Sequence, residues 1–135
     1  MKHPLDQISA EEIKNAVDLC RSYKGFDENA LFVNISLIEP EKDYVRTYKG
    51  GEDFPRNLKI RGIDSNNDGG FVAIVDMKAN KIISLERVSQ EAQVTYNMTE
   101  IFMAQELTKA NQDYQEALKK RGITDLDLVQ IDPWP

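Results

Sequence analysis

The sequence predicts an α+β fold in which an N-terminal helix packs across an antiparallel sheet of about four strands, followed by a helix pair and a short strand. Three observations predict this fold. Apolar residues recur at helical spacing after Ser9, and they alternate with polar residues in several runs between positions 31 and 88. Helical spacing then returns after Val88.

The first helix is expected to begin after Ser9, because Ser9 and Glu12 have the spacing of a capping box. Ile8 and Ile13 have the spacing of the hydrophobic staple that accompanies such caps. Gly25 is expected to end the helix. The predicted buried stripe consists of Ile13, Ala16, Val17, Cys20 and Tyr23.

The centre of the predicted sheet is a hairpin of residues 71–76 and 82–88, both of which are rich in Val and Ile. Residues 78–80 form its turn, in which Asn80 can adopt a left-handed conformation at little cost. Everything before this hairpin is expected to cover or extend the sheet.

An earlier strand is expected at residues 31–38, where apolar residues alternate. Its more apolar face is predicted to carry Leu31, Val33, Ile35 and Leu37. Residues 41–48 then form a short helical turn, and residues 49–55 form a loop that contains two glycines. The next strand is expected from Leu58 to Gly62.

The residues after the hairpin predict a second unit. Asn97 can cap a helix with Glu100 three residues later, Asn111 begins a second helix, and Gly122 is expected to end it. Residues 126–131 are predicted to form one further strand, for which no partner strand follows. The sequence therefore divides into domains 1–92 and 93–135, the second of which is incomplete. Its apolar residues need cover and form a candidate interface: Phe102, Leu107, Leu118, Val129 and Trp134.

Composition restricts the functional classes. A hydrophobic fraction of 41% with 30% charged residues is typical of a soluble globular protein, and the net charge of −6 disfavours nucleic-acid binding. No apolar run approaches the roughly 20 residues that span a membrane. The first residues lack the apolar stretch of a secretory signal, so we expect a cytoplasmic protein without membrane contact. Cys20 is the single cysteine and is expected to be a small buried side chain.

One stretch resembles half of a metal-binding motif. Asp64, Asn66, Asp68 and Gly69 match the beginning of a calcium-binding EF-hand loop, but the position of its essential Glu is Val75. A polar β-turn is therefore the preferred interpretation. His3 is the single histidine, which excludes a site built from several histidines.

Three stretches resemble the N-terminal region of copper-dependent primary amine oxidases. They read HPLDQISAEEIKNAVDL at 3–19, FVAIVDMKANKIISLERV at 71–88 and ALKKRGITDLDLVQIDPWP at 117–135, in the family's order. The resemblance implies that residues 1–92 form the cystatin-like domain called N2. It further implies that residues 93–135 begin the related domain called N3. Both domains precede a large catalytic β-sandwich in that family.

The resemblance also implies what this chain lacks. Catalysis in the family requires three copper-binding histidines, an Asp base and a Tyr in an Asn-Tyr-Asp/Glu context that becomes topaquinone. None of the five tyrosines has that context, so no catalytic, cofactor-binding or metal-ligating residue is assigned to any position. Copper and topaquinone would belong to a separate catalytic chain.

The functional expectation is therefore a non-catalytic N-terminal domain or accessory subunit, of the kind found as a small subunit of a tyramine-type oxidase. Its expected partner is a catalytic amine oxidase chain or a second copy of itself. An independent cystatin-like module that binds a small ligand or peptide is the alternative. A concave apolar pocket with convergent polar groups would favour that alternative.

Overall fold

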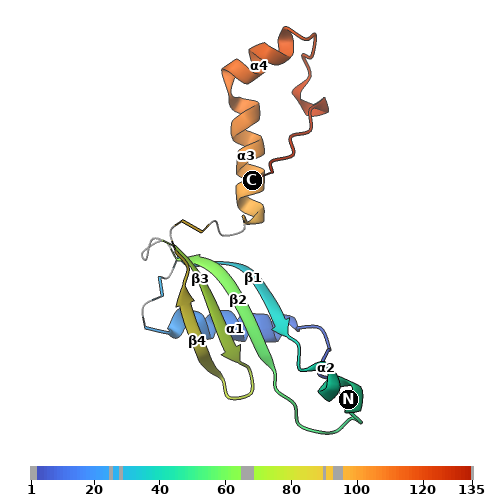
Figure 1. Cartoon of the computed structure of the whole chain (residues 1–135). Coiled ribbons are helices and arrows are strands. Elements are labelled where there is room, and N and C mark those ends of the chain that lie inside the picture. The colour runs from blue at the N-terminus through green and yellow to red at the C-terminus, as the bar shows by residue number, and fades with distance from the viewer. Residues whose placement is uncertain are drawn as a thin grey trace. The chain divides into compact units, whose positions relative to one another are not determined.

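The computed structural model describes residues 3–24, 26–27, 29–64, 69–89, 91–92 and 96–134. The chain divides into two compact units, unit 1 at Met1–Val94 and unit 2 at Thr95–Pro135. Unit 1 contains helix α1 and a four-stranded antiparallel sheet, and unit 2 contains further helices (Figure 1). This arrangement confirms the predicted α+β class.

The sheet of unit 1 has the strand order β1-β2-β3-β4, so each strand pairs with its neighbour in sequence. The strands are β1 (Leu31–Ile38), β2 (Asn57–Asp64), β3 (Gly69–Asp76) and β4 (Lys81–Arg87). Helix α1 (Ala10–Ser22) crosses one face of this sheet, and the short helix α2 (Lys42–Thr47) joins β1 to β2 (Figure 1). The buried core between α1 and the sheet consists of Ala16, Cys20, Leu58, Ile60, Phe71, Ala73 and Val75.

The cap of α1 is the predicted capping box. Ser9 Oγ accepts a hydrogen bond from the Glu12 amide at 3.1 Å, and Glu12 Oε2 accepts one from the Ser9 amide at 2.8 Å. The helix ends at Ser22, with Tyr23 as its cap, and Gly25 lies outside the described residues.

The predicted buried stripe of α1 is only partly correct. Ala16 and Cys20 are fully buried, and both are small enough to let the helix approach the sheet closely. By contrast, Ile13 is 39% exposed and Tyr23 is 48% exposed, so the ends of the stripe lie outside the core. Leu19, which was not in the prediction, packs against the core instead.

The predicted alternation of β1 is wrong at its beginning. The pairing register with β2 shifts between Phe32 and Asn34, so Val33 is an extra residue in a β-bulge. Because of this shift Phe32 packs into the core with Ile35, whereas Leu31 is 48% exposed. The ring of Phe32 meets that of Phe71 with 5.8 Å between centroids, which gives the bulge a packing role.

The hairpin of β3 and β4 is confirmed, although β4 begins one residue earlier than predicted. Asp76 Oδ1 accepts hydrogen bonds from the amides of Lys78 and Ala79, both at 2.9 Å, and this organises the turn. Asn80 has a φ of 50°, as predicted for the left-handed position. The predicted polar β-turn joins β2, which ends at Asp64, to β3, which begins at Gly69, and its residues 65–68 lie outside the described residues.

Unit 2 contains helices α3 (Met98–Ala110) and α4 (Gln112–Lys119). Both predicted caps are confirmed, because Asn97 forms a capping box with Glu100 and the Asn111 side chain accepts from the Tyr114 amide. Gly122 has a φ of 80° and ends α4 as predicted. Its amide donates to Lys119 at 2.9 Å and the next amide donates to Leu118 at 3.0 Å, which is the Schellman pattern.

The predicted strand at 126–131 is wrong. Leu126–Leu128 form a 3-10 turn, and Asp125 Oδ1 accepts a hydrogen bond from the Asp127 amide at 3.0 Å. Residues 96–134 contain no strand for this segment to pair with, so a local cap satisfies its backbone instead. The segment then returns to α3, where Gln105 Nε2 donates to the Ile131 carbonyl at 2.9 Å.

Candidate functional site

The described residues do not provide the ligands of a copper site. Among them, no group of three or more His, Cys, Asp or Glu side chains could hold a metal ion. His3, the single histidine, accepts a hydrogen bond from the Leu5 amide at Nδ1 and packs edge-on against Tyr48. One imidazole does not fit the three-histidine copper centre implied by the resemblance, nor does any tyrosine context fit topaquinone.

Two other candidate chemical groups have structural roles. Asp64, the first residue of the EF-hand-like stretch, is fully buried and accepts a hydrogen bond from Arg87 at 2.6 Å. Cys20 is buried in the core, and burial raises the pKa of its thiol to about 11. The thiol therefore stays protonated at neutral pH and lacks the reactivity of a thiolate.

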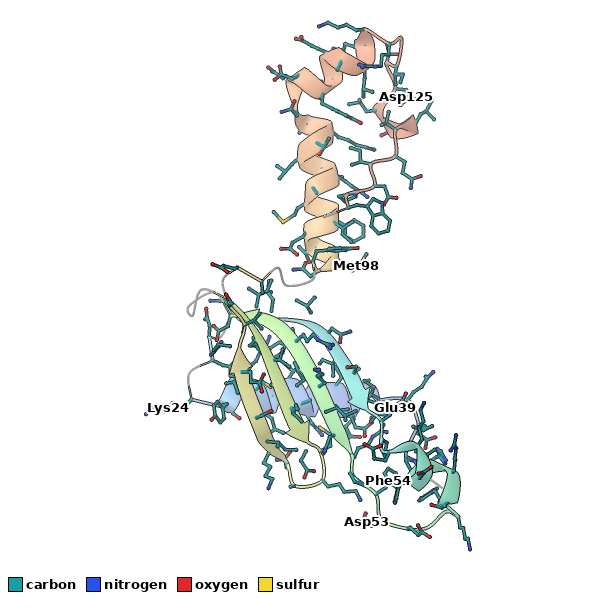
Figure 2. All side chains as sticks on the ribbon, viewed as in Figure 1. Lys24, Glu39, Asp53, Phe54, Met98 and Asp125 are labelled. Carbon is teal, nitrogen blue, oxygen red and sulfur yellow. The ribbon has the colours of Figure 1, made fainter. Side chains whose placement is uncertain are left out.

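A cleft of about 420 Å³ lies beside the N-terminus of α1, and it is the feature that would favour a ligand-binding module. Its lining includes Glu12, Phe54, Arg56 and Lys78. Phe54 and Asp53 lie together in the loop between α2 and β2 (Figure 2). The Lys78 ammonium binds Asp53 and also lies 5.2 Å from the centre of the Phe54 ring.

Arg56 joins this cleft to the N-terminal segment and is mostly buried. Its Nε donates to Glu12 Oε1 at 2.7 Å and its Nη2 donates to Glu12 Oε2 at 3.1 Å, which forms a bidentate ion pair. Its remaining N–H groups donate to the backbone carbonyls of Pro4, Asp6 and Gln7. The hydrogen bond from Arg56 is the largest cause that lowers the pKa of Glu12 from 4.5 to about 2.

These contacts identify the Arg56 cluster as a fold-stabilising site. The Arg56 guanidinium and the Glu12 carboxylate bind each other and nearby protein atoms, so they have little hydrogen-bonding capacity left for a ligand in the cleft. Sequence reasoning did not find Arg56, because its partners lie 44 to 52 residues away in the chain. No local pattern marks such a contact.

Unit 2 has a different kind of site, an exposed apolar surface along α3. Figure 2 shows its first residue, Met98, at the beginning of the helix. The exposed fractions are 62% for Met98, 59% for Phe102, 56% for Met103 and 67% for Leu107. We call these four residues the α3 apolar surface. Met98 and Met103 were not among the predicted interface residues.

The opposite side of α3 is covered within unit 2. Ile101, Ala104, Gln105 and Thr108 are half-buried, and the Gln105 side chain binds the returning C-terminal segment. Helix α3 is therefore apolar on more than one side. A helix with apolar residues on all sides is usually buried on all sides.

The remaining predicted interface residues are distributed unequally. Leu118 and Val129 are half-buried within unit 2, whereas Trp134 is 77% exposed beside a shallow hollow of about 190 Å³. That hollow lies between the N-terminal half of α3 and the tail, and it includes Tyr96, Ile101 and Pro133. Leu128 is 83% exposed. It was not among the predicted interface residues, because residues 126–131 were expected to form a strand. None of the helices among the described residues has the length and hydropathy of a membrane-spanning segment.

Comparison with known proteins identifies the relatives of this chain. The family model for the copper amine oxidase N2 domain matches residues 3–88. A primary amine oxidase of Arthrobacter sp. (strain P1) is 30% identical over 134 residues, which are 99% of this chain and 20% of that protein. A primary amine oxidase of Klebsiella aerogenes is 31% identical over 97% of this chain and 17% of its own length.

Plant proteins are also similar. The peroxisomal N-methylputrescine oxidase 1 of Nicotiana tabacum is 28% identical over 98% of this chain and 21% of its own length. The chain thus spans about a fifth of the length of these relatives. The family resemblance inferred from the three sequence stretches is confirmed: the chain belongs to the copper amine oxidase family.

Proposed function

We propose that this chain is a non-catalytic N-terminal part of a copper amine oxidase that acts in assembly. In this proposal the α3 apolar surface contacts the portion of the oxidase that carries copper and the catalytic residues. The single observation that carries the proposal is the exposure of Met98, Phe102, Met103 and Leu107 along one helix.

The two long helices support this interpretation. Helices α1 and α3 each have 13 residues and each begins with a capping box, Ser9 with Glu12 and Asn97 with Glu100. Helix α1 buries its apolar side against a sheet, whereas residues 96–134 contain no strand that could cover α3. Since α3 has the same beginning and length as α1, we infer that it also packs against a layer, which the rest of the oxidase supplies.

The energy available from such cover is substantial. Burying a Leu, Met or Phe side chain contributes about 1.5–3 kcal/mol. Four side chains that are each more than half exposed would therefore contribute several kcal/mol, before the costs of association are subtracted.

The test is to co-express the tagged chain with the amine oxidase sequence of the same genome that carries an Asn-Tyr-Asp/Glu motif and a His-x-His pair. We expect the two to co-purify. Phe102→Asp and Leu107→Asp should each weaken binding, because they put a charge on the apolar surface. Leu5→Asp is the matched control, because Leu5 is 42% exposed on unit 1.

Two further measurements complete the test. The purified chain, supplied with copper and a primary amine, should produce no hydrogen peroxide, because it lacks the residues that catalysis in this family requires. A chain that sediments as a monomer and does not bind the catalytic sequence would contradict the proposal. A homodimer that Phe102→Asp dissociates would also contradict it, since a second copy would then cover α3.

A further inference from the structure

The sheet of unit 1 has a second face that α1 does not cover (Figure 1). On β2 the buried residues Leu58 and Ile60 alternate with Lys59 and Arg61, which therefore point to this second face. The pairing registers place residues of the other three strands beside them. We call this set the open face: Asn34, Ser36, Lys59, Arg61, Val72, Ile74, Ser84 and Glu86.

The open face is arranged as parallel columns. Arg61 lies between Asn34 and Val72, and Lys59 lies between Ser36 and Ile74. A basic column on β2 is therefore adjacent to an apolar column on β3. A docking element would meet both columns at once.

Strand β3 has the composition of a strand that is covered on both sides. Phe71, Ala73 and Val75 are buried under α1, and the alternate residues Val72 and Ile74 are apolar as well. Strands with one solvated face usually alternate apolar and polar residues, whereas strands buried on both faces are continuously apolar. The sequence of β3 therefore indicates cover over the open face.

The basic column indicates the charge of that cover. Arg61 Nη1 donates to the neutral amide oxygen of Asn34 at 3.1 Å. None of the ion pairs among the described residues includes Lys59. The neighbouring strands place Asn34, Ser36, Val72 and Ile74 opposite these two residues, so no carboxylate is directly opposite either cation. The whole chain has a net charge of −6, which makes two adjacent unneutralised cations a local exception.

We propose that the open face docks an acidic element with an apolar stripe that belongs to the remainder of the amine oxidase. This inference rests on the proposed function and adds a second contact surface to it. The relatives contain about four-fifths of their length beyond the part matched by this chain, so the family has ample sequence to supply such an element. Lys59 and Arg61 pair with its carboxylates, and Val72 and Ile74 receive its apolar stripe.

The test uses the same catalytic sequence as an immobilised probe and measures the affinity of the full chain by biolayer interferometry. The double variant Lys59→Glu/Arg61→Glu should bind at least about tenfold more weakly, because close charge pairs at interfaces contribute more than 1.4 kcal/mol. The variant Ile74→Ser should also bind more weakly. Lys24→Glu/Lys49→Glu, which makes the same charge change at exposed loop positions, should bind as the wild type does.

Salt provides a second readout. Wild-type affinity should fall between 50 and 300 mM NaCl more steeply than that of the Lys59→Glu/Arg61→Glu variant, because the attraction between opposite charges is screened. Circular dichroism of each variant establishes that it is folded.

The outcomes separate the two proposals. If the wild type does not bind the probe, the proposed function fails and this inference fails with it. If the wild type binds and Phe102→Asp reduces binding while the open-face variants bind normally, only the present inference is overturned. An equal loss in the Lys24→Glu/Lys49→Glu control would also overturn it, since the effect would then follow net charge rather than the open face.

Discussion

Replacing Arg56 by Met is expected to destabilise unit 1 by about 3 kcal/mol, because breaking a buried ion pair leaves the partner charge uncompensated. Only 10% of the Arg56 side chain and 18% of the Glu12 side chain are exposed. The substitution removes both hydrogen bonds to Glu12 and those to the carbonyls of Pro4, Asp6 and Gln7. Met keeps most of the aliphatic volume, so the effect reports the lost polar contacts.

The magnitude can be obtained from Glu12. Its pKa is lowered from 4.5 to about 2, chiefly by the hydrogen bond from Arg56, with further contributions from the Ser9 cap. At about 1.4 kcal/mol per pKa unit this corresponds to about 3–4 kcal/mol at neutral pH. The Ser9 cap contributes part of this value and remains in the variant. Of the three carbonyls that lose a donor, only that of Pro4 belongs to a buried residue, and its unpaired oxygen adds about 1 kcal/mol, which offsets the part of the value that the Ser9 cap retains.

The same pKa determines the pH dependence. A carboxyl group with a lowered folded-state pKa stabilises the fold above its unfolded pKa, here 4.5, and this stability is lost as the pH falls toward about 2. The free energy of unfolding of the wild type should therefore decrease across this window. In Arg56→Met the decrease should be smaller, because Glu12 then titrates closer to its ordinary pKa.

The assay is urea unfolding at pH 7 and pH 3, followed by far-ultraviolet circular dichroism and by the amide NMR signals of β2. Fluorescence is unsuitable, because the single tryptophan, Trp134, belongs to unit 2. The control is Lys14→Met, which breaks the Lys14–Asp18 pair at 2.6 Å, with side chains 74% and 54% exposed. That pair should contribute less than about 0.5 kcal/mol. The reasoning is refuted if Arg56→Met costs no more than Lys14→Met, or if its pH dependence equals that of the wild type.

Three further predictions concern glycines and the buried thiol. Gly62→Ala should destabilise unit 1 by about 2 kcal/mol in urea unfolding, because its Cβ would overlap the Leu31 carbonyl oxygen and lie 2.6 Å from the Phe71 ring. In the control Gly51→Ala the added Cβ meets no atom within 4 Å, so the free energy of unfolding should fall by only about 1 kcal/mol, the cost of the positive φ. An equal loss of stability in Gly62→Ala and Gly51→Ala would contradict the packing argument. Gly122→Ala should lower the stability of unit 2 by about 1 kcal/mol in the Trp134 fluorescence transition, since its φ is 80°. Cys20 should react with Ellman's reagent at pH 8 much more slowly in the native protein than in 6 M urea, because burial raises the pKa of its thiol to about 11; equal rates would exclude the buried position.

Features specified by neighbouring residues could be predicted from the sequence. Both capping boxes join residues three positions apart, and Asn80 and Gly122 adopt positive φ values for reasons internal to their own turns. The hairpin of β3 and β4 follows from its Val and Ile content and a short turn. In each case the determining atoms lie within a few residues of one another.

Features specified by distant residues could not be predicted. The bulge in β1 lets Phe32 join the rings of Phe26 and Phe71, at centroid distances of 6.5 and 5.8 Å, and a local alternation pattern contains no information about those rings. The Arg56 cluster is similar, because its acceptors come from the N-terminal segment. The predicted strand at 126–131 was wrong because a distant partner is missing. A strand needs a neighbouring strand, and residues 96–134 contain none.

The contrast between α1 and α3 explains why the candidate site was nonetheless visible in the sequence. A capping box and helix propensity make a helix form locally, but the distribution of its apolar residues depends on what covers it. Helix α1 presents Glu11, Lys14 and Asp18 to solvent and therefore needs cover on one side only. When the two caps are aligned, Phe102 of α3 lies at the position of Lys14, and both Phe102 and Leu107 are more than half exposed. Because exposed apolar side chains favour association, the α3 apolar surface is where a partner of unit 2 should be sought first.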